Sequence, residues 1–159
     1  MAAPRYGHNG TVGPAPRFSW DEVRCRDGWL PDDIQSRRNI VKSCMYLNEF
    51  RRSIARRFKV SERNVFIIIN SCARSVSYNR KIGGATQSFH SVRFDGKGTS
   101  AMDIQILVKR LDGKLVKLKP SFVGDLAEKY VAEYRNGGIG RYAVFTHVDH
   151  RGYRSRWVG

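Results

Sequence analysis

The sequence predicts an α+β fold, in which two main helices pack on a central antiparallel sheet within one small domain. Two segments, 39–58 and 121–134, carry apolar residues at spacings of three and four, which is the period of an amphipathic helix. Short apolar runs rich in β-branched residues, at 65–69, 101–108 and 142–148, have the length of strands. The chain has 159 residues, which is the usual size of one domain.

The N-terminal part of the chain is expected to be an arm. Residues 1–17 are rich in Gly, Pro and Ala with scattered basic residues, a composition that predicts flexibility. Ser19 followed by Asp21 and Glu22 is the pattern of a helix N-terminus, with acidic side chains in the first turn. The sequence therefore divides into an arm over 1–17 and a folded domain over 18–159.

The first long helix, 39–58, has an apolar face and a basic face. The apolar face consists of Ile40, Val41, Cys44, Leu47, Phe50, Ile54 and Phe58. The basic face consists of Arg37, Arg38, Lys42, Arg51, Arg52, Arg56 and Arg57. Because a basic helix face is more often solvated than used for docking, we expect these cations to lie in solvent.

A long polar stretch separates two of the expected strands. It covers 70–100, between the strands at 65–69 and 101–108, and connections of this length are usually functional or mobile. After the second strand, Asp112-Gly113 predicts a turn that leads into a further strand at 115–118.

The second helix is expected to begin at Ser121, which can cap it, and to end at Asn136-Gly137-Gly138. Its apolar stripe consists of Phe122, Val123, Leu126, Ala127, Tyr130, Val131 and Tyr134. The last strand, 142–148, is followed by a basic tail over 151–159.

The chain is strongly basic. Lys and Arg number 29 and Asp and Glu 14, which gives a formal net charge of +15. Such an excess predicts attraction to an anionic partner, and nucleic acid, teichoic acid, lipopolysaccharide and acidic lipid all qualify. The charge alone does not choose among these partners.

Targeting and redox signals are sparse. No run of apolar residues is long enough for a membrane span, and the first 16 residues lack the apolar segment of a secretory signal. The three cysteines, Cys25, Cys44 and Cys72, lie far apart, which indicates neither a disulfide framework nor a cysteine zinc site. We therefore expect small semi-buried thiols and synthesis in a reducing cytoplasm.

The candidate chemistry centres on a few histidines. His8 lies in the expected arm, and the remaining histidines are His90, His147 and His150. On a strand His147 and Asp149 share a face, and Asp103 can approach His147 if their two strands pair. Two imidazoles and one carboxylate are a frequent catalytic zinc shell, with a fourth position for water. The spacing alone leaves open that these are surface or hydrogen-bonded polar residues.

The sequence around these residues resembles one known family. The segments that carry the resemblance are Phe18–Glu22, Ile69–Ser75, Tyr78–Ala85, Ser88–His90, Ala101–Ile104, Gly137–Tyr142 and Phe145–Asp149. Together, and in this order over roughly 18–157, they resemble the M15-type zinc peptidases. That group includes D-alanyl-D-alanine carboxypeptidases, L,D- and D,D-endopeptidases and phage endolysins.

The resemblance implies a set of site residues. The Ser-x-His motif of the family falls on His90, its Ala-x-Asp motif on Asp103 and its His-Val-Asp motif on His147, which makes these the three Zn²⁺ ligands at an edge or cleft of the sheet. The arginine that the family carries in its earlier motif falls on Arg74. A fixed guanidinium there is expected to position the substrate or stabilise an oxyanion.

Two features depart from the family. Twelve residues separate His90 from Asp103, about twice the usual spacing, and the extra residues within 91–100 are expected to form a hairpin-like loop beside the metal. The insertion is also expected to shape access of the substrate.

The second departure concerns the proton acceptor. Relatives carry Glu or His shortly before the last ligand, where this chain has Val144 and Phe145. Asp149, on the face of His147, is the candidate general base, and His150 is the second candidate. An alternative role for Asp149, that of orienting the imidazole, stays open.

The resemblance implies a zinc-dependent peptidase that cleaves stem peptides or cross-links of bacterial peptidoglycan. We expect a phage endolysin, monomeric, made in the host cytoplasm and active after lysis at the periplasm and cell wall, with its basic surface held near an anionic wall. One alternative is a basic nucleic-acid-binding domain, although finger, recognition-helix and RNA-sheet signatures are missing. The other is a non-catalytic relative in which zinc only holds the fold.

Overall fold

The computed structural model describes residues 10–91 and 99–159. The fold of this part is α+β, as expected, with five α-helices, a short 3-10 helix and eight strands among the described residues. Contacts divide the chain into two units, described in turn below: residues 1–45 with 71–102, and residues 46–70 with 103–159. No helix in the described part is both long enough and apolar enough to cross a membrane.

The first unit begins with a hairpin and a short helix. Strands β1 (Thr11–Val12) and β2 (Ala15–Ser19) pair antiparallel, and they begin within residues 1–17, where the sequence predicts an arm. Helix α1 (Trp20–Val23) follows, and Ser19 and Glu22 form a capping box, in which Glu22 accepts the Ser19 backbone N–H at 2.7 Å. The expected helix start at Ser19 is thus confirmed, while residues 1–9 lie outside the described part.

Helix α2 (Ile34–Phe58) is longer than its predicted counterpart. Asp33 accepts the Ser36 backbone N–H at 2.7 Å, which is the hydrogen bond of an N-terminal cap and explains the earlier start. The predicted apolar stripe is buried at Ile40, Cys44, Leu47, Phe50 and Ile54.

One cation of the expected basic face is not in solvent. Arg51 is only 6% exposed, because it follows Leu47 by four positions and precedes Ile54 by three, and so lies on the buried stripe. Arg37 is half-buried, with its guanidinium over the Trp20 ring at 5.7 Å. The exposed members of the face are Arg38, Lys42, Arg52, Arg56 and Arg57.

The long polar stretch of the first unit contains a short helix, α3 (Val76–Lys81). Ser75 caps it by accepting the Tyr78 backbone N–H at 3.1 Å. The loop expected beside the metal falls largely on residues 92–98, which lie outside the described part.

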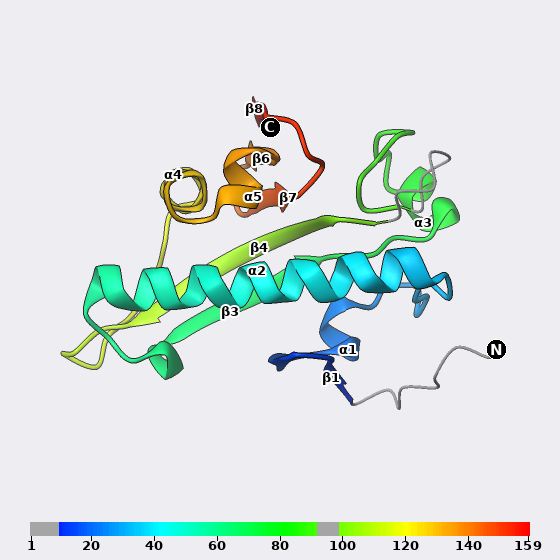
Figure 1. The fold of residues 1–159 in the computed structure, drawn as a ribbon. Coiled ribbons are helices and arrows are strands. Elements are labelled where there is room, and N and C mark those ends of the chain that lie inside the picture. Colours follow the sequence, from blue (N-terminus) through cyan, green and yellow to red (C-terminus); the bar gives the residue numbers. More distant parts are fainter. Residues whose placement is uncertain (1–9, 92–98) are drawn as a thin grey trace. The chain divides into compact units, whose positions relative to one another are not determined.

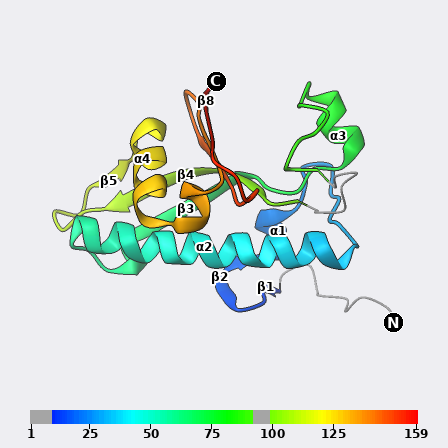
Figure 2. The same cartoon turned by 45° about the horizontal axis from the view of Figure 1, so that its top comes forward.

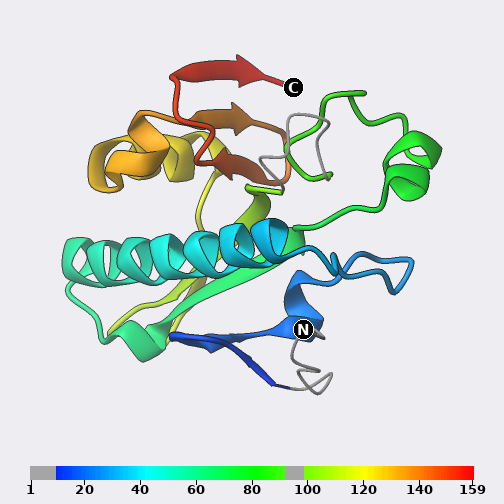
Figure 3. The ribbon, with the colours of Figure 1, turned by 45° about the vertical axis from the view of Figure 1, so that its right-hand side comes forward.

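The second unit is built on a six-stranded sheet with the order β3-β4-β7-β6-β8, to which β5 adds by pairing with β4. The strands are β3 (Val65–Ser71), β4 (Ala101–Lys109), β5 (Leu115–Lys117), β6 (Gly138–Arg141), β7 (Thr146–Asp149) and β8 (Ser155–Val158). Figure 3 shows β7, β6 and β8 side by side. The sequence predicts an antiparallel sheet. The observed sheet is mixed, because β6 pairs antiparallel with β7 but parallel with β8.

The C-terminal part of the sheet differs from the prediction. The strand expected at 142–148 is shorter and begins later, as β7, while residues 142–145 form a turn in which the Tyr142 N–H donates to the Phe145 carbonyl at 3.1 Å. An additional strand, β6, begins at Gly138, within the segment predicted to end the second helix. The turn residues Tyr142–Phe145 contain no Gly or Pro, so the usual turn signal is missing. The expected basic tail contains strand β8.

The second predicted helix is also divided. Helix α4 (Pro120–Tyr130) and helix α5 (Ala132–Arg135) are separated by Val131, which is extended and fully buried. The N-cap is Lys119 with Pro120 in the first turn, so the predicted cap at Ser121 is wrong. Proline is favoured at that position because its missing N–H has no partner there in any helix.

Aromatic contacts hold these helices in the second unit. The buried Tyr134 ring of α5 meets Tyr46 and Phe50 of α2 edge-on, at centroid distances of 6.2 and 6.4 Å. Helix α4 packs on β6 and β7, and Figure 1 shows both short helices beside these strands.

Candidate metal centre

Two of the predicted ligands come from neighbouring strands of the sheet. Asp103 lies on β4 and His147 on β7, and only 3% and 7% of their surfaces are exposed. The His147 Nδ1 atom is 3.0 Å from the Asp103 Oδ1 atom. The strand pairing thus brings the carboxylate and the imidazole together, as the sequence interpretation required.

The other ring nitrogen of His147 faces Asp149, which shares its side of β7. The Nε2 atom lies 2.8 Å from Asp149 Oδ2, and Asp149 is fully buried. The carboxylate of Asp149 also accepts the backbone N–H groups of Gly138 and Arg151, both at 3.1 Å. The Arg151 guanidinium donates to it through Nε at 2.8 Å and Nη2 at 2.5 Å. Both oxygens of Asp149 are therefore occupied by donors.

These contacts set the ionisation of the pair. Burial lowers the pKa of His147, but its hydrogen bonds with Asp103 and Asp149 outweigh burial and raise that pKa overall. Burial raises the pKa of Asp149, but the hydrogen bonds from Arg151 and His147 prevail and hold that pKa below its usual range. Asp149 is therefore an ionised and firmly held carboxylate.

The arrangement defines which His147 atom can bind a metal. With the proton on Nε2, which donates to Asp149, the lone pair of Nδ1 lies on the side of Asp103. Two ligand atoms of one tetrahedral zinc ion lie about 3.3 Å apart, since each bond is about 2.0–2.1 Å long. The 3.0 Å between Nδ1 and the Asp103 oxygen is close to that separation.

The third predicted ligand, His90, is fixed by backbone groups of the first unit. Its Nδ1 atom is 2.7 Å from the Cys72 carbonyl oxygen, and its own carbonyl accepts the Arg74 N–H at 2.7 Å. When Nδ1 donates to Cys72, Nε2 carries the lone pair. The imidazole is 3% exposed, so its orientation is determined by protein groups.

Among the residues that the structure describes, His90, Asp103 and His147 form a group suited to a metal ion. One candidate ligand atom from each lies within 4.8 Å of the others, and all three residues are buried. Two nitrogens and one carboxylate oxygen are a donor set that zinc accepts, with one position left for water or substrate. The residues present therefore fit a zinc ion.

An aromatic side chain that the sequence interpretation missed lies against His147. Trp157 of β8 has its ring centroid 5.0 Å from that of His147, with the planes tilted by 54°. Gly140 of β6 pairs with His147 on one side and Trp157 on the other, and a Cβ atom at position 140 would lie 2.5 Å from the indole. Trp157 thus reaches His147 across a residue without a side chain.

Further contacts hold the indole and the carboxylate behind the imidazole. The Trp157 Nε1–H donates to the Tyr142 hydroxyl at 2.9 Å, and the Arg151 guanidinium lies 5.1 Å from the indole centroid. A Cβ atom at Gly138 would lie 2.3 Å from Asp149 Oδ2. The two glycines at alternate positions of β6 are the sequence signal that could have indicated large groups packed over this strand.

The other two predicted site residues lie in different surroundings. The Arg74 Nε–H donates to Ser71 Oγ at 2.8 Å, and the backbone of Arg74 holds His90, as described above. His150 follows β7 and packs edge-on against Tyr46, with centroids 5.4 Å apart. It is out of phase with His147 and Asp149 along the strand, so it does not share their face.

Comparison with known proteins adds one positive result. The model of the family described as Peptidase M15 matches residues 16–149. No curated protein and no solved structure matches the chain significantly.

Proposed function

Because the chain belongs to the Peptidase M15 family, we propose that it is a zinc-dependent metallopeptidase with His90, Asp103 and His147 as the metal ligands. The observation that supports this most is the buried group of two imidazoles and one carboxylate within the matched part of the chain. A bound zinc ion would supply Lewis-acid polarisation of the scissile carbonyl and activation of a water molecule.

In this proposal the protein groups around the ligands orient them. Asp149 keeps the proton of His147 on Nε2 and thereby directs Nδ1 to the metal, while Arg151 keeps Asp149 ionised and in place. The Cys72 carbonyl has the same role toward His90. Such partners raise the basicity of the ligands and restrict the rotation of their rings.

We assign Asp149 this orienting role rather than that of proton acceptor. A general base needs an oxygen that can reach a water molecule, and both oxygens of Asp149 already accept from Arg151, Gly138 and His147. Its low pKa also makes it a weak base.

Arg74 is proposed to position the substrate. Its backbone N–H donates to the carbonyl of His90, so the Arg74 backbone lies next to that of a proposed ligand. The Arg74 Nε–H donates to the Ser71 hydroxyl at 2.8 Å, which orients the guanidinium, and a guanidinium is a suitable donor to a substrate carbonyl or carboxylate.

The proposed substrate is a stem peptide or cross-link of bacterial peptidoglycan, and the proposed biological role is that of a phage endolysin acting at the cell wall after lysis. The net charge of +15 supports this, because anionic wall polymers attract a basic enzyme. The family membership supports a peptidase over a nucleic-acid-binding domain.

The test compares the wild type with His147→Ala. We expect stoichiometric zinc and release of peptide fragments from peptidoglycan by the wild type, loss of both in His147→Ala, and recovery of chelator-treated wild type when zinc is returned. Zinc without turnover in the wild type would instead support a structural metal. A wild type that binds no zinc, yet binds DNA or RNA in a salt-sensitive way, contradicts the proposal.

His150→Ala tests the second candidate base in the same assays. Because His150 packs against Tyr46 and is out of phase with His147, we expect this variant to keep zinc and turnover. A variant that keeps zinc but loses turnover would restore His150 as the proton acceptor.

A further inference from the structure

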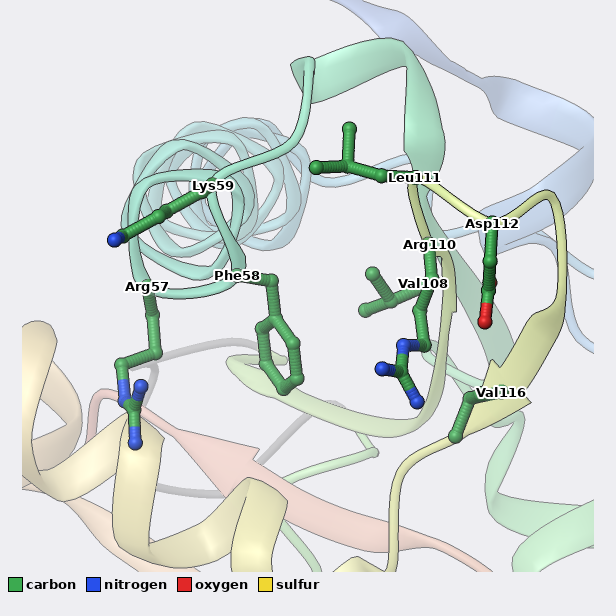
Figure 4. A pocket seen from close by; sticks show the side chains of 8 residues that line it. All are labelled: Arg57, Phe58, Lys59, Val108, Arg110, Leu111, Asp112 and Val116. Atoms are coloured by element: carbon green, nitrogen blue, oxygen red, sulfur yellow. The ribbon is translucent and has the colours of Figure 1, made fainter.

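A cavity of about 520 Å³ lies between the C-terminal end of α2 and the β4–β5 hairpin (Figure 4). Figure 2 shows this hairpin at the end of the long helix. The residues that line the cavity belong to the second unit, and none of them is part of the candidate metal centre.

The tip of the hairpin exposes an aliphatic side chain that the turn does not require. The turn is closed by the Arg110 N–H on the Lys114 carbonyl at 2.8 Å, by the Gly113 N–H on the Arg110 carbonyl at 2.9 Å and by the Lys114 N–H on the Asp112 carboxylate at 3.1 Å. Leu111 takes part in none of these bonds, and 84% of its surface is exposed. A polar residue would serve the turn equally well, so the fold does not explain Leu111.

The apolar surface continues from the tip along the hairpin and into the cavity. Val116, which lines the cavity with Leu111, is 37% exposed, whereas Leu115 precedes it on β5 and faces the other side of the strand. Figure 4 shows Phe58 at the end of α2 and Leu111 at the hairpin, both among the side chains that line the cavity. Exposed apolar groups that adjoin one another in this way mark a binding surface more often than single exposed residues do.

Cations surround this apolar surface. Arg57, Lys59 and Arg110 line the cavity and are exposed. The exposed hairpin cations are Lys109, Arg110, Lys114, Lys117 and Lys119. Between Lys109 and Lys119 the one acidic residue is Asp112, whose carboxylate accepts a hydrogen bond within the turn.

We propose that this hairpin surface, formed by Arg57, Lys59, Arg110, Leu111 and Val116, docks on an acidic lipid bilayer. A soluble polyanion would satisfy the cations but leave Leu111 and Val116 in water, whereas the lipid interface accepts both kinds of group. Each Lys or Arg held near an acidic leaflet changes partition by about fivefold. The docking is peripheral and independent of the peptidase proposal.

The first test measures co-sedimentation of the full chain with phosphatidylcholine vesicles, with and without phosphatidylglycerol. Leu111→Ser is expected to lower partition onto the acidic vesicles by about tenfold. Val158→Ser is the matched control, because Val158 is 83% exposed but belongs to β8, and it is expected to bind like the wild type.

A second pair of variants tests the cations. Lys59→Gln with Arg110→Gln is expected to lower partition more than Arg80→Gln with Lys81→Gln, which removes the same charge from α3. Leu111→Trp reports insertion directly, since its fluorescence should shift to the blue on acidic vesicles and be quenched by lipids with brominated acyl chains. Circular dichroism checks that each variant is folded.

Three results would overturn the inference. Equal partition of Leu111→Ser and Val158→Ser would mean that net charge alone holds the protein to the vesicles. A Leu111→Trp indole that stays in water on bound vesicles would exclude insertion of the hairpin tip. Binding of teichoic acid or DNA through Lys59 and Arg110, with no binding to acidic vesicles, would assign the surface to a soluble polyanion.

Discussion

At the scale of single residues, the candidate metal centre depends on groups that hold the imidazoles as much as on the ligands. Asp149 illustrates this, because its carboxylate joins Arg151 and a backbone N–H to the Nε2 atom of His147. A metal-bound histidine whose second nitrogen has such a partner keeps one tautomer and one orientation.

Asp149→Asn separates the two roles considered for this residue. If Asp149 orients His147, the variant should weaken zinc binding by about 10–100-fold, because the amide neither carries charge nor fixes the tautomer as firmly. Competition with a chromogenic chelator measures the affinity. Unchanged zinc affinity together with lost turnover would return Asp149 to the role of proton acceptor, and Asp125→Asn, at an exposed ion pair with Arg141, is the control.

Trp157 is expected to act on zinc binding through His147. Trp157→Ala removes the indole that lies 5.0 Å from the imidazole, so the ring gains freedom and zinc affinity should fall by about tenfold. Trp157→Phe should recover most of the affinity, since an aromatic ring again covers His147. The d–d spectrum of the cobalt-substituted protein reports the ligand geometry, and an unchanged spectrum and affinity in Trp157→Ala would contradict the role.

Among the site residues, the sequence identifies the candidate ligands but not the side chains that hold them. His90, Asp103 and His147 stand in motifs that resemble a known family, so the sequence alone is enough to identify them as candidate ligands. Trp157 and Arg151 have no such motif. The contact of Trp157 with His147 depends on which strand lies beside β6, and that pairing joins residues that no local pattern relates. Arg151 contacts Asp149 from two positions away, through a chain reversal that no motif marks.

At the scale of elements, strand β6 lies between β7 and β8 and allows Trp157 of β8 to contact His147 of β7. Gly140 has no side chain, so the indole of Trp157 crosses above it and reaches His147 on the far side. The sequence interpretation used the glycines of this segment as a helix stop and placed the strand later. The parallel pairing of β6 with β8 could not be read from a four-residue strand in a basic tail.

Gly140→Ala tests this arrangement. The added Cβ would lie 2.5 Å from the indole, so Trp157 must shift and the protein should lose about 1–3 kcal/mol of unfolding free energy. Urea titration measures the loss. The same substitution in a Trp157→Ala background should cost much less, because the clashing ring is absent, and an equal cost in both backgrounds would place the strain elsewhere.

At the scale of the whole molecule, the α+β class, the long helix and the β4–β5 hairpin could be predicted, because periodicity and turn chemistry act locally. Strand β6 and the parallel pairing of β8 could not be predicted. They depend on how segments distant in sequence pack, and the turn at Tyr142–Phe145 carries no turn residue. Arg51 of helix α2 is likewise predicted to lie in solvent because it is charged, but its position on the apolar stripe buries it.

The C-terminal strand is also tied to the rest of its unit by charge. Glu128 of α4 accepts from Arg154 at 2.8 Å and from Arg156, the neighbour of Trp157, at 3.1 Å. Hydrogen bonds from Arg156 and Arg154 lower the pKa of Glu128 from 4.5 to about 2. The folded protein stabilises the ionised form of Glu128 more than the unfolded chain does. The ion pairs therefore stabilise the fold at pH values above the pKa of Glu128 in the unfolded chain.

That stabilisation should disappear in acid, which gives a prediction for the molecule as a whole. As pH falls from about 4.5 to about 2, Glu128 takes up a proton in the unfolded chain before it does so in the folded one, and stability drops. Glu128→Gln should be less stable than the wild type at neutral pH, and the difference should shrink across this window. Urea unfolding followed by tryptophan fluorescence at a series of pH values measures both curves, with Glu62→Gln as a control for an acidic residue outside α4. Curves that stay parallel down to the lowest pH would show that Glu128 does not link α4 to the C-terminal strand.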